Sequence, residues 1–139
     1  MSLEIAERER EGIKILDLKG PLQFGSSDLR FRAELEKLAQ ARTCRVIVNL
    51  KDVAHLDTAG LGTLLFALAK MSKAGGRLVL VNLNAAHINL VVLARMEAVF
   101  EVFREELDAV NSFFPDRKVT HFDILEFVHS VEPPREPDH

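Results

Sequence analysis

The chain has 139 residues, a formal net charge of −3 and 28% charged side chains. A single domain of this size can bury about two-thirds of its unfolded surface and fold unaided. Lys and Arg are scattered and form no basic stripe, so nucleic acid is not an expected partner. The sequence shows neither a signal peptide nor an apolar run of the ~20 residues that a membrane span needs, so a cytoplasmic protein without membrane contact is expected. The single Cys44 cannot form an internal disulfide and is expected to be a small core residue beside a strand.

Alternation of apolar and polar residues predicts two strands at the start of the chain, over 3–9 and 12–19, joined at Gly12. Gly20-Pro21 then ends the second strand. A helix to about Ala41 is expected next, and residues suited to cap it are Ser26, Ser27 and Asp28. Its apolar residues recur at helical spacing and predict one buried face: Phe31, Leu35 and Leu38.

The continuous apolar run over 45–50 predicts a strand that is covered on both faces. An apolar helix from 58 to about Ala74 follows, with Gly75-Gly76 as its end. A second buried strand is predicted over 77–83, and it repeats the Val-Asn-Leu ending of the first. A strand, a helix and a strand with short connections form a βαβ unit.

The remaining elements predict an α/β fold with a small mixed sheet of about four or five strands and about four helices. They are a helix over about 85–95 capped by Asn84, an edge strand over 99–103, and a helix over 105–114 ended by Pro115. The domain is expected to span 1–114. A C-terminal extension over 115–139 can form a short helix over 119–131, followed by an acidic and Pro-rich tail with too little to bury to be ordered.

Residue patterns that support catalysis are scarce. The His residues show no metal-ligand spacing, and Gly60-x-Gly62 is only a fragment of a dinucleotide-binding motif, because Leu65 stands where its third Gly would be. No Gly-rich loop ends in Lys-Ser or Lys-Thr. We therefore expect no enzyme activity, no metal and no cofactor.

The motif LDTAGLG, residues 56–62, stands where the central helix begins. Asp57 is placed to cap this helix, with Thr58 as its first residue. Gly60 and Gly62 are unexpected there, because Gly in a helix costs roughly 0.8–1 kcal/mol relative to Ala. Two explanations are open: close packing on the sheet, or close approach by another protein.

Helical spacing divides this helix into two stripes. One contains the leucines Leu61, Leu64, Leu65 and Leu68, and the other contains Thr58, Gly62, Phe66 and Ala69. If the leucines face the sheet, the second stripe presents a hydroxyl, a bare backbone and an aromatic ring to a partner. The alternative is that Phe66 belongs to the core.

Residues 46–62, from Val46 through the LDTAGLG motif, resemble the signature of STAS domains, the anti-sigma factor antagonists of bacteria. The resemblance extends over about 3–114. It implies that Thr58 accepts a phosphate, and that the partner is an anti-sigma factor serine/threonine kinase of the histidine-kinase-like ATPase fold. The unphosphorylated antagonist would bind this kinase and free the sigma factor, as a monomer or weak homodimer. The residues implied in partner binding are Asp57, Thr58, Ala59, Gly60, Gly62 and Phe66.

The sequence departs from the family pattern at two places. Gly20-Pro21-Leu22-Gln23 stands where the family has Gly-x-Leu-Asp, and Arg95 stands where a Gly commonly ends the third helix. A second function therefore stays open, in which this is a STAS subunit of a sensor or transport-associated complex and Thr58 is not switched.

Overall fold

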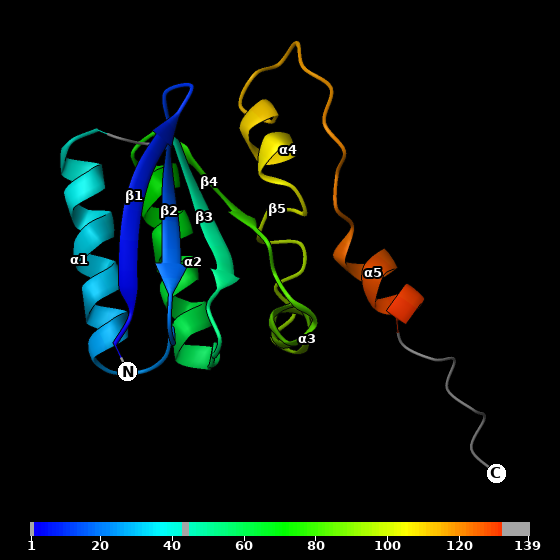
Figure 1. Ribbon diagram of the computed structural model, residues 1–139, viewed down its shortest axis with the longest axis horizontal. Helices are drawn as coiled ribbons and strands as arrows, with labels where there is room; N and C mark the ends of the chain where they lie inside the picture. The colour runs from blue at the N-terminus through cyan, green and yellow to red at the C-terminus, as the bar shows by residue number, and fades with distance from the viewer. Residues whose placement is uncertain (1, 43–44, 132–139) are drawn as a thin grey trace.

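A computed structural model describes residues 2–42 and 45–131, and within these residues five strands form one sheet accompanied by five helices (Figure 1). The strand order is β1-β2-β3-β4-β5, in which β1 and β2 are antiparallel and the later pairs are parallel. The strands are β1 Glu4–Arg10, β2 Ile13–Lys19, β3 Arg45–Asp52, β4 Arg77–Val81 and β5 Val102–Phe103. The helices are α1 Ser26–Gln40, α2 Thr58–Lys73, α3 Ala85–Leu93, α4 Glu106–Asn111 and α5 Ile124–Val131. The predicted α/β class with a mixed sheet is confirmed.

The β1–β2 hairpin turns on two residues with left-handed backbone. Glu11 has φ 51° and Gly12 has φ 80°, and Arg10 pairs with Ile13 across the turn. A two-residue hairpin loop needs positive φ at both central positions when its twist is to match that of the strands. The predicted junction at Gly12 is therefore confirmed.

Several of the predicted elements are shorter in the structure, and the strand predicted over 77–83 ends at Val81, after which Asn82 takes a left-handed φ of 63°. Val99 belongs to a turn in which its N–H donates to the Met96 carbonyl at 3.0 Å, so the strand predicted over 99–103 is reduced to β5. The helix predicted over 105–114 ends at Asn111, because the Phe113 and Phe114 N–H groups donate to carbonyls only three residues back. The helix predicted over 119–131 begins at Ile124, since the carboxylate of Asp123 caps it by accepting the Glu126 N–H at 3.1 Å.

The helix ends follow from their caps. α3 begins at its predicted cap, Asn84, and stops at Leu93, where Arg95 takes a left-handed conformation with φ 57°. Gly75 does the same at the end of α2, with φ 82°. Both ends have the paired backwards hydrogen bonds of a Schellman motif, so Arg95 occupies the position that usually favours Gly. The N-cap of α1 is Gly25. The side chains of residues 26–28, Cys44 and the tail from residue 132 lie outside the described residues.

The sheet is covered on both faces. On one face α1 and α2 pack side by side, and their buried residues share a cluster with the inward residues of β2, β3 and β4 (Figure 1). On the other face α4 covers a smaller cluster made of Ile13, Ile15, Ile47, Val79, Val81, Phe103, Ala109 and Val110. Along β3, Val46 and Val48 belong to the first cluster and Ile47 to the second, and all three are fully buried. The prediction of a strand covered on both faces is confirmed.

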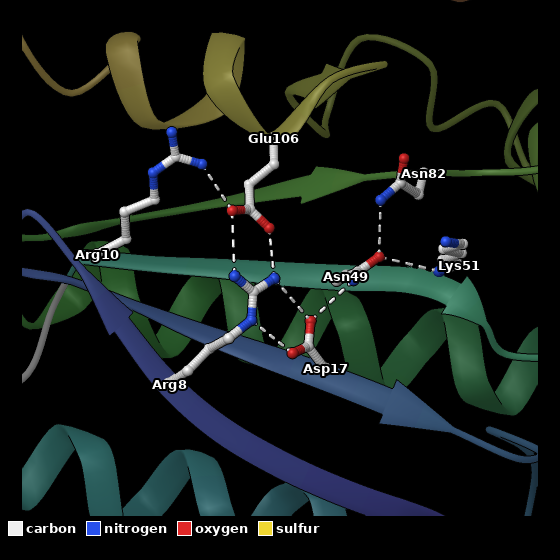
Figure 2. A network of polar contacts seen from close by, with 7 residues as sticks. All are labelled: Arg8, Arg10, Asp17, Asn49, Lys51, Asn82 and Glu106. Atoms are coloured by element: carbon white, nitrogen blue, oxygen red, sulfur yellow. Dashed lines mark hydrogen bonds and ion pairs between the residues drawn. The ribbon is translucent and has the colours of Figure 1, made fainter.

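A polar network lies on the α4 side of the sheet, beside the smaller cluster (Figure 2). The Arg8 guanidinium pairs with Asp17 on β2, where Nε and Oδ2 are 2.6 Å apart, and with Glu106 on α4. The Asn49 amide donates to Asp17 at 2.8 Å and accepts from the Asn82 amide at 2.9 Å. The network therefore connects β1, β2, β3, the end of β4 and α4.

The ion pairs of this network predict a loss of stability in acid. The hydrogen bond from Arg8 lowers the pKa of Asp17, and hydrogen bonds from Arg8 and then Arg10 lower the pKa of Glu106. Carboxyl groups with lowered pKa stabilise the fold above their unfolded values near 4, and this contribution is lost as the pH falls through the folded pKa. We expect Arg8→Gln to lower the free energy of unfolding by about 1 kcal/mol at pH 7, because exposed pairs contribute little each.

The measurement is urea unfolding of both proteins between pH 7 and pH 3. The difference between wild type and Arg8→Gln should shrink below about pH 4, where the carboxylates become protonated. Lys118→Gln, at an exposed position between α4 and α5, is the control and should leave the acid dependence unchanged. A difference that stays constant down to pH 3 would show that Arg8 acts through packing and not through charge.

Candidate functional site

The start of α2 is organised by the carboxylate of Asp57. Asp57 has an extended backbone as the N-cap, and its Oδ1 accepts the Gly60 N–H at 2.7 Å. The first helical backbone bond joins the Leu61 N–H to the Asp57 carbonyl at 2.9 Å. The other carboxylate oxygen, Oδ2, accepts the N–H of Phe24 at 3.2 Å. The predicted cap is confirmed, and it also connects α2 to the segment that leads into α1.

The loop between β3 and α2 is fixed by the segment that follows β2. The Gly20 N–H donates to the Asp52 carbonyl at 3.0 Å, and the Leu22 N–H donates to the His55 carbonyl at 2.9 Å. Leu22 and Leu56 form an isolated parallel bridge. Because this loop ends at Asp57, these bonds set the position at which α2 begins.

His87 holds the same loop from the side of α3. Its Nε2 lies 2.9 Å from the Val53 carbonyl, and its Nδ1 accepts the Asn84 N–H at 3.2 Å. Since Nδ1 accepts, Nε2 carries the proton and donates to Val53. Burial lowers the pKa of His87, which favours this neutral form. No role is predicted for His87 from the sequence, although Asn84-x-x-His87 has the spacing of a capping box with His in the place of Glu or Gln.

Thr58 is exposed as the first residue of α2. It therefore stands at the positive end of the helix dipole, beside the carboxylate of Asp57. A hydroxyl here is accessible to an enzyme, and an anion attached to it would be stabilised by the helix dipole and the nearby backbone N–H groups.

The two glycines of the motif have different surroundings. Gly60 is buried, and a β-carbon on it would lie 2.0 Å from the carbonyl oxygen of Leu22. Only Gly lets the helix start approach the chain so closely. A β-carbon on Gly62 would have no neighbour within 4 Å among the described residues outside its own helical turn. Packing within the chain therefore explains Gly60 and leaves Gly62 unexplained.

The two stripes of α2 face in the expected directions. Leu61 and Leu64 are buried, and Leu65 and Leu68 are half-buried against the same core. On the other stripe, Thr58 and Ala69 are exposed while Gly62 and Phe66 are half-buried. The ring of Phe66 is partly covered by Arg32 of α1, whose guanidinium carbon lies 4.5 Å from the ring centroid. Phe66 is thus neither a core residue nor a fully exposed one.

In the part of the chain that the structure describes, no group of three or more His, Cys, Asp or Glu side chains is placed to hold a metal ion. Among those same residues, none of the helices combines the length and apolarity needed to cross a membrane.

The model of the STAS domain family matches residues 4–109. The chain belongs to the STAS domain family. A curated relative, the anti-sigma F factor antagonist of Paenibacillus polymyxa, is 24% identical over 112 residues, which are 80% of this chain and 95% of the relative.

Solved structures of other proteins share this fold. An anti-sigma factor antagonist from Mycobacterium paratuberculosis is 15% identical, with a TM-score of 0.70 over 79% of this chain and 92% of the other. The Bacillus cell fate determinant SpoIIAA in its phosphorylated form is also 15% identical, with a TM-score of 0.62 over 79% and 99%. A sulfate transporter family protein from Wolinella succinogenes is 19% identical, with a TM-score of 0.63 over 75% and 85%.

The residues beyond the family match pack against this STAS domain. Ile124 and Val128 of α5 are buried in the cluster that also contains residues of α3. The Thr120 N–H donates to the carboxylate of Asp108 on α4 at 3.2 Å. This extension covers the side of the sheet at β5, whereas α1 lies at the opposite side (Figure 1).

The different surroundings of the two glycines give a matched pair of substitutions. We expect Gly60→Ala to destabilise the protein by about 1–3 kcal/mol or more, because its methyl group must displace the backbone of Leu22. We expect Gly62→Ala to stabilise it by about 0.5–1 kcal/mol, because Ala forms helix better and meets open space. Denaturant unfolding of both variants is the test, and equal effects would contradict the distinction.

Proposed function

We propose that this protein is an anti-sigma factor antagonist that is switched by phosphorylation of Thr58. The unphosphorylated chain binds an anti-sigma factor that is itself a serine/threonine kinase of the histidine-kinase-like ATPase fold, and so frees the sigma factor. The observation that carries the proposal is the exposed Thr58 at the start of α2, within the matched STAS domain. The Paenibacillus polymyxa relative and the phosphorylated SpoIIAA structure support it.

The switch follows from where the phosphate is added. A phosphate on Thr58 adds about −1.5 to −2 charge at neutral pH. The N-terminus of α2 stabilises this charge, so the fold is retained. The adjacent Asp57 keeps the local potential negative. A partner that covers this surface must then bury uncompensated charge, which costs several kcal/mol, and the complex dissociates.

The proposed partner-binding residues divide into two kinds. Thr58, Gly62 and Phe66 lie on the outward stripe of α2, with Ala59 half-buried beside Thr58, and these contact the partner. Gly60 is buried and Asp57 bonds within the chain, so these two act by positioning the helix start. The kinase supplies ATP and the catalytic groups, and this chain supplies the acceptor hydroxyl.

A second function is favoured by two observations. A sulfate transporter family protein shares the fold, and Gln23 stands where the family commonly has an acidic residue. In that case the chain is a STAS subunit of a sensor or transport-associated complex, and Thr58 is not phosphorylated. Labelling of Thr58 by a kinase from the same organism distinguishes the two functions.

Thr58→Ala should abolish labelling by the cognate kinase in the presence of radioactive ATP. The fold should be retained, with a change of no more than about 0.5 kcal/mol in the free energy of unfolding, because the residue is exposed. The separate variant Thr58→Ser keeps a hydroxyl at this position and should still be labelled. Phosphate that persists in Thr58→Ala, for instance on the exposed Ser72, would show that the acceptor is a different residue.

Gly62→Glu should prevent kinase binding without unfolding the domain. It places a carboxylate one helical turn beyond Thr58, at a position where a β-carbon meets open space and helix propensity favours Glu over Gly. Burial of an unpaired carboxylate in the interface costs several kcal/mol, or a thousandfold or more in affinity. Affinity for the kinase and thermal unfolding are both measured.

The control for this substitution is Leu64→Ala on the buried stripe. Leu64 is fully buried, so its truncation should lower stability by about 2–5 kcal/mol through the cavity it leaves. If Gly62→Glu unfolds as readily as Leu64→Ala, or binds the kinase as wild type does, the outward stripe of α2 is not the binding surface.

A further inference from the structure

Two large apolar side chains are exposed at the start of α1, and packing within the chain explains neither. Phe24 is 82% exposed just before α1, and Leu29 is 69% exposed on the first turns of that helix. Neither belonged to the binding surface that the motif predicts. Single exposed apolar residues are ordinary, but these two are close in sequence, and α1 begins at the same end of the domain as α2 (Figure 1).

Phe24 is held beside Thr58 by a hydrogen bond. The Phe24 N–H donates to Oδ2 of Asp57 at 3.2 Å, and Asp57 immediately precedes Thr58. The next residue, Gly25, has φ 115°, a conformation that suits Gly, so the chain turns sharply there into α1. The backbone of Phe24 is therefore fixed to the start of α2 while its ring stays in solvent.

The register between α1 and α2 brings the first turn of α1 level with the bare part of α2. Arg32 lies over the ring of Phe66, and Glu36 pairs with Lys70 at 2.8 Å. These two pairs have the same offset in sequence, and the hydrogen bond between Phe24 and Asp57 differs from that offset by one residue. Continued one turn back along the two helices, it brings the backbone of residue 28, which precedes Leu29, level with Gly62. The outward surface at this end is thus made by both helices.

We propose that Phe24 and Leu29 are hydrophobic anchors for the anti-sigma factor kinase that phosphorylates Thr58, and that they enter an apolar pocket on that kinase. This rests on the proposed function. A kinase must bring its ATP within bonding distance of the Thr58 hydroxyl, so its surface necessarily covers the residues around it. A standard interface buries about 800 Å² on each partner, a patch about 16 Å in radius, and Phe24 falls within such a patch centred on Thr58.

The anchors also explain how one phosphate can release the partner. Truncation of a buried aromatic anchor typically weakens binding more than truncation of the contacts around it. If the ring of Phe24 is buried by the kinase, Thr58 lies at the centre of the dry part of the interface and not at its wet rim. A phosphate on Thr58 cannot be hydrated while the kinase is bound to Phe24, so the complex is destabilised.

The probe for the test is the kinase, among those purified from the same organism, that labels Thr58 of the wild-type chain. Its affinity for the unphosphorylated full chain is measured by calorimetry for wild type, Phe24→Ala, Leu29→Ala and Leu107→Ala. Leu107 is the matched control, since it is 53% exposed on α4, which packs on the other face of the sheet. Thermal unfolding of all four should agree closely, because the substituted side chains are exposed.

We expect Phe24→Ala to weaken binding about thirtyfold or more and Leu29→Ala about five- to tenfold, with Leu107→Ala unchanged. Wild-type affinity in Phe24→Ala, for a kinase that still labels Thr58, would overturn the inference and leave the proposed function standing. If no kinase labels Thr58 in the wild-type chain, the proposed function fails and the inference fails with it. If the wild type dimerises, and Phe24→Ala abolishes the dimer but leaves the kinase affinity unchanged, the inference is overturned. The partner of Phe24 would then be a second copy of the chain.

Discussion

The carboxylate of Asp57 is the interaction on which the geometry of the site depends. One oxygen caps α2 by accepting the Gly60 N–H, and the other accepts the Phe24 N–H. A single side chain therefore joins the start of α2 to the segment between β2 and α1. A water molecule could satisfy either donor, but it could not fix the distance between them. The position of Thr58 relative to the entry into α1 is therefore set by covalent geometry plus two hydrogen bonds.

The close approach at Gly60 makes this arrangement possible. The carbonyl of Leu22 occupies the space that a β-carbon would need, and the neighbouring Leu22 N–H bonds to the His55 carbonyl. The loop that carries the motif and the segment after β2 are consequently in backbone contact. Gly62 has no such neighbour in the described chain beyond its own helical turn. The two glycines of the motif are thus required for different reasons. Gly60 is required for folding, and on our proposal Gly62 is required for binding.

How far the sequence predicts this structure depends on how local each determinant is. The Asp57 and Asn84 caps, the Gly12 turn and the two-sided burial of β3 were predictable, because each depends on neighbouring residues. The reach of Asp57 to Phe24 was not, because propensity and periodicity say nothing of contacts between residues far apart in the chain. The same reason applies to the Asn49–Asn82 bond: the repeated Val-Asn-Leu ending was visible, but its pairing requires β3 and β4 to lie side by side in register.

The predicted lengths of the short elements near the C-terminus were wrong for another reason. β5 and α4 are shortened by turns whose hydrogen bonds close over three residues, and apolar periodicity does not reveal such turns, whereas α5 fills apolar surface beside α3. The extension covers part of this side of the domain, although Leu93 and Leu107 stay exposed there. The end of α2 at Thr58 and the start of α1 are left open, with a hydroxyl, a bare backbone and an unburied aromatic ring on one surface. Because these groups lie at the starts of α1 and α2, a partner that covers this surface also covers the place where a phosphate on Thr58 would add charge.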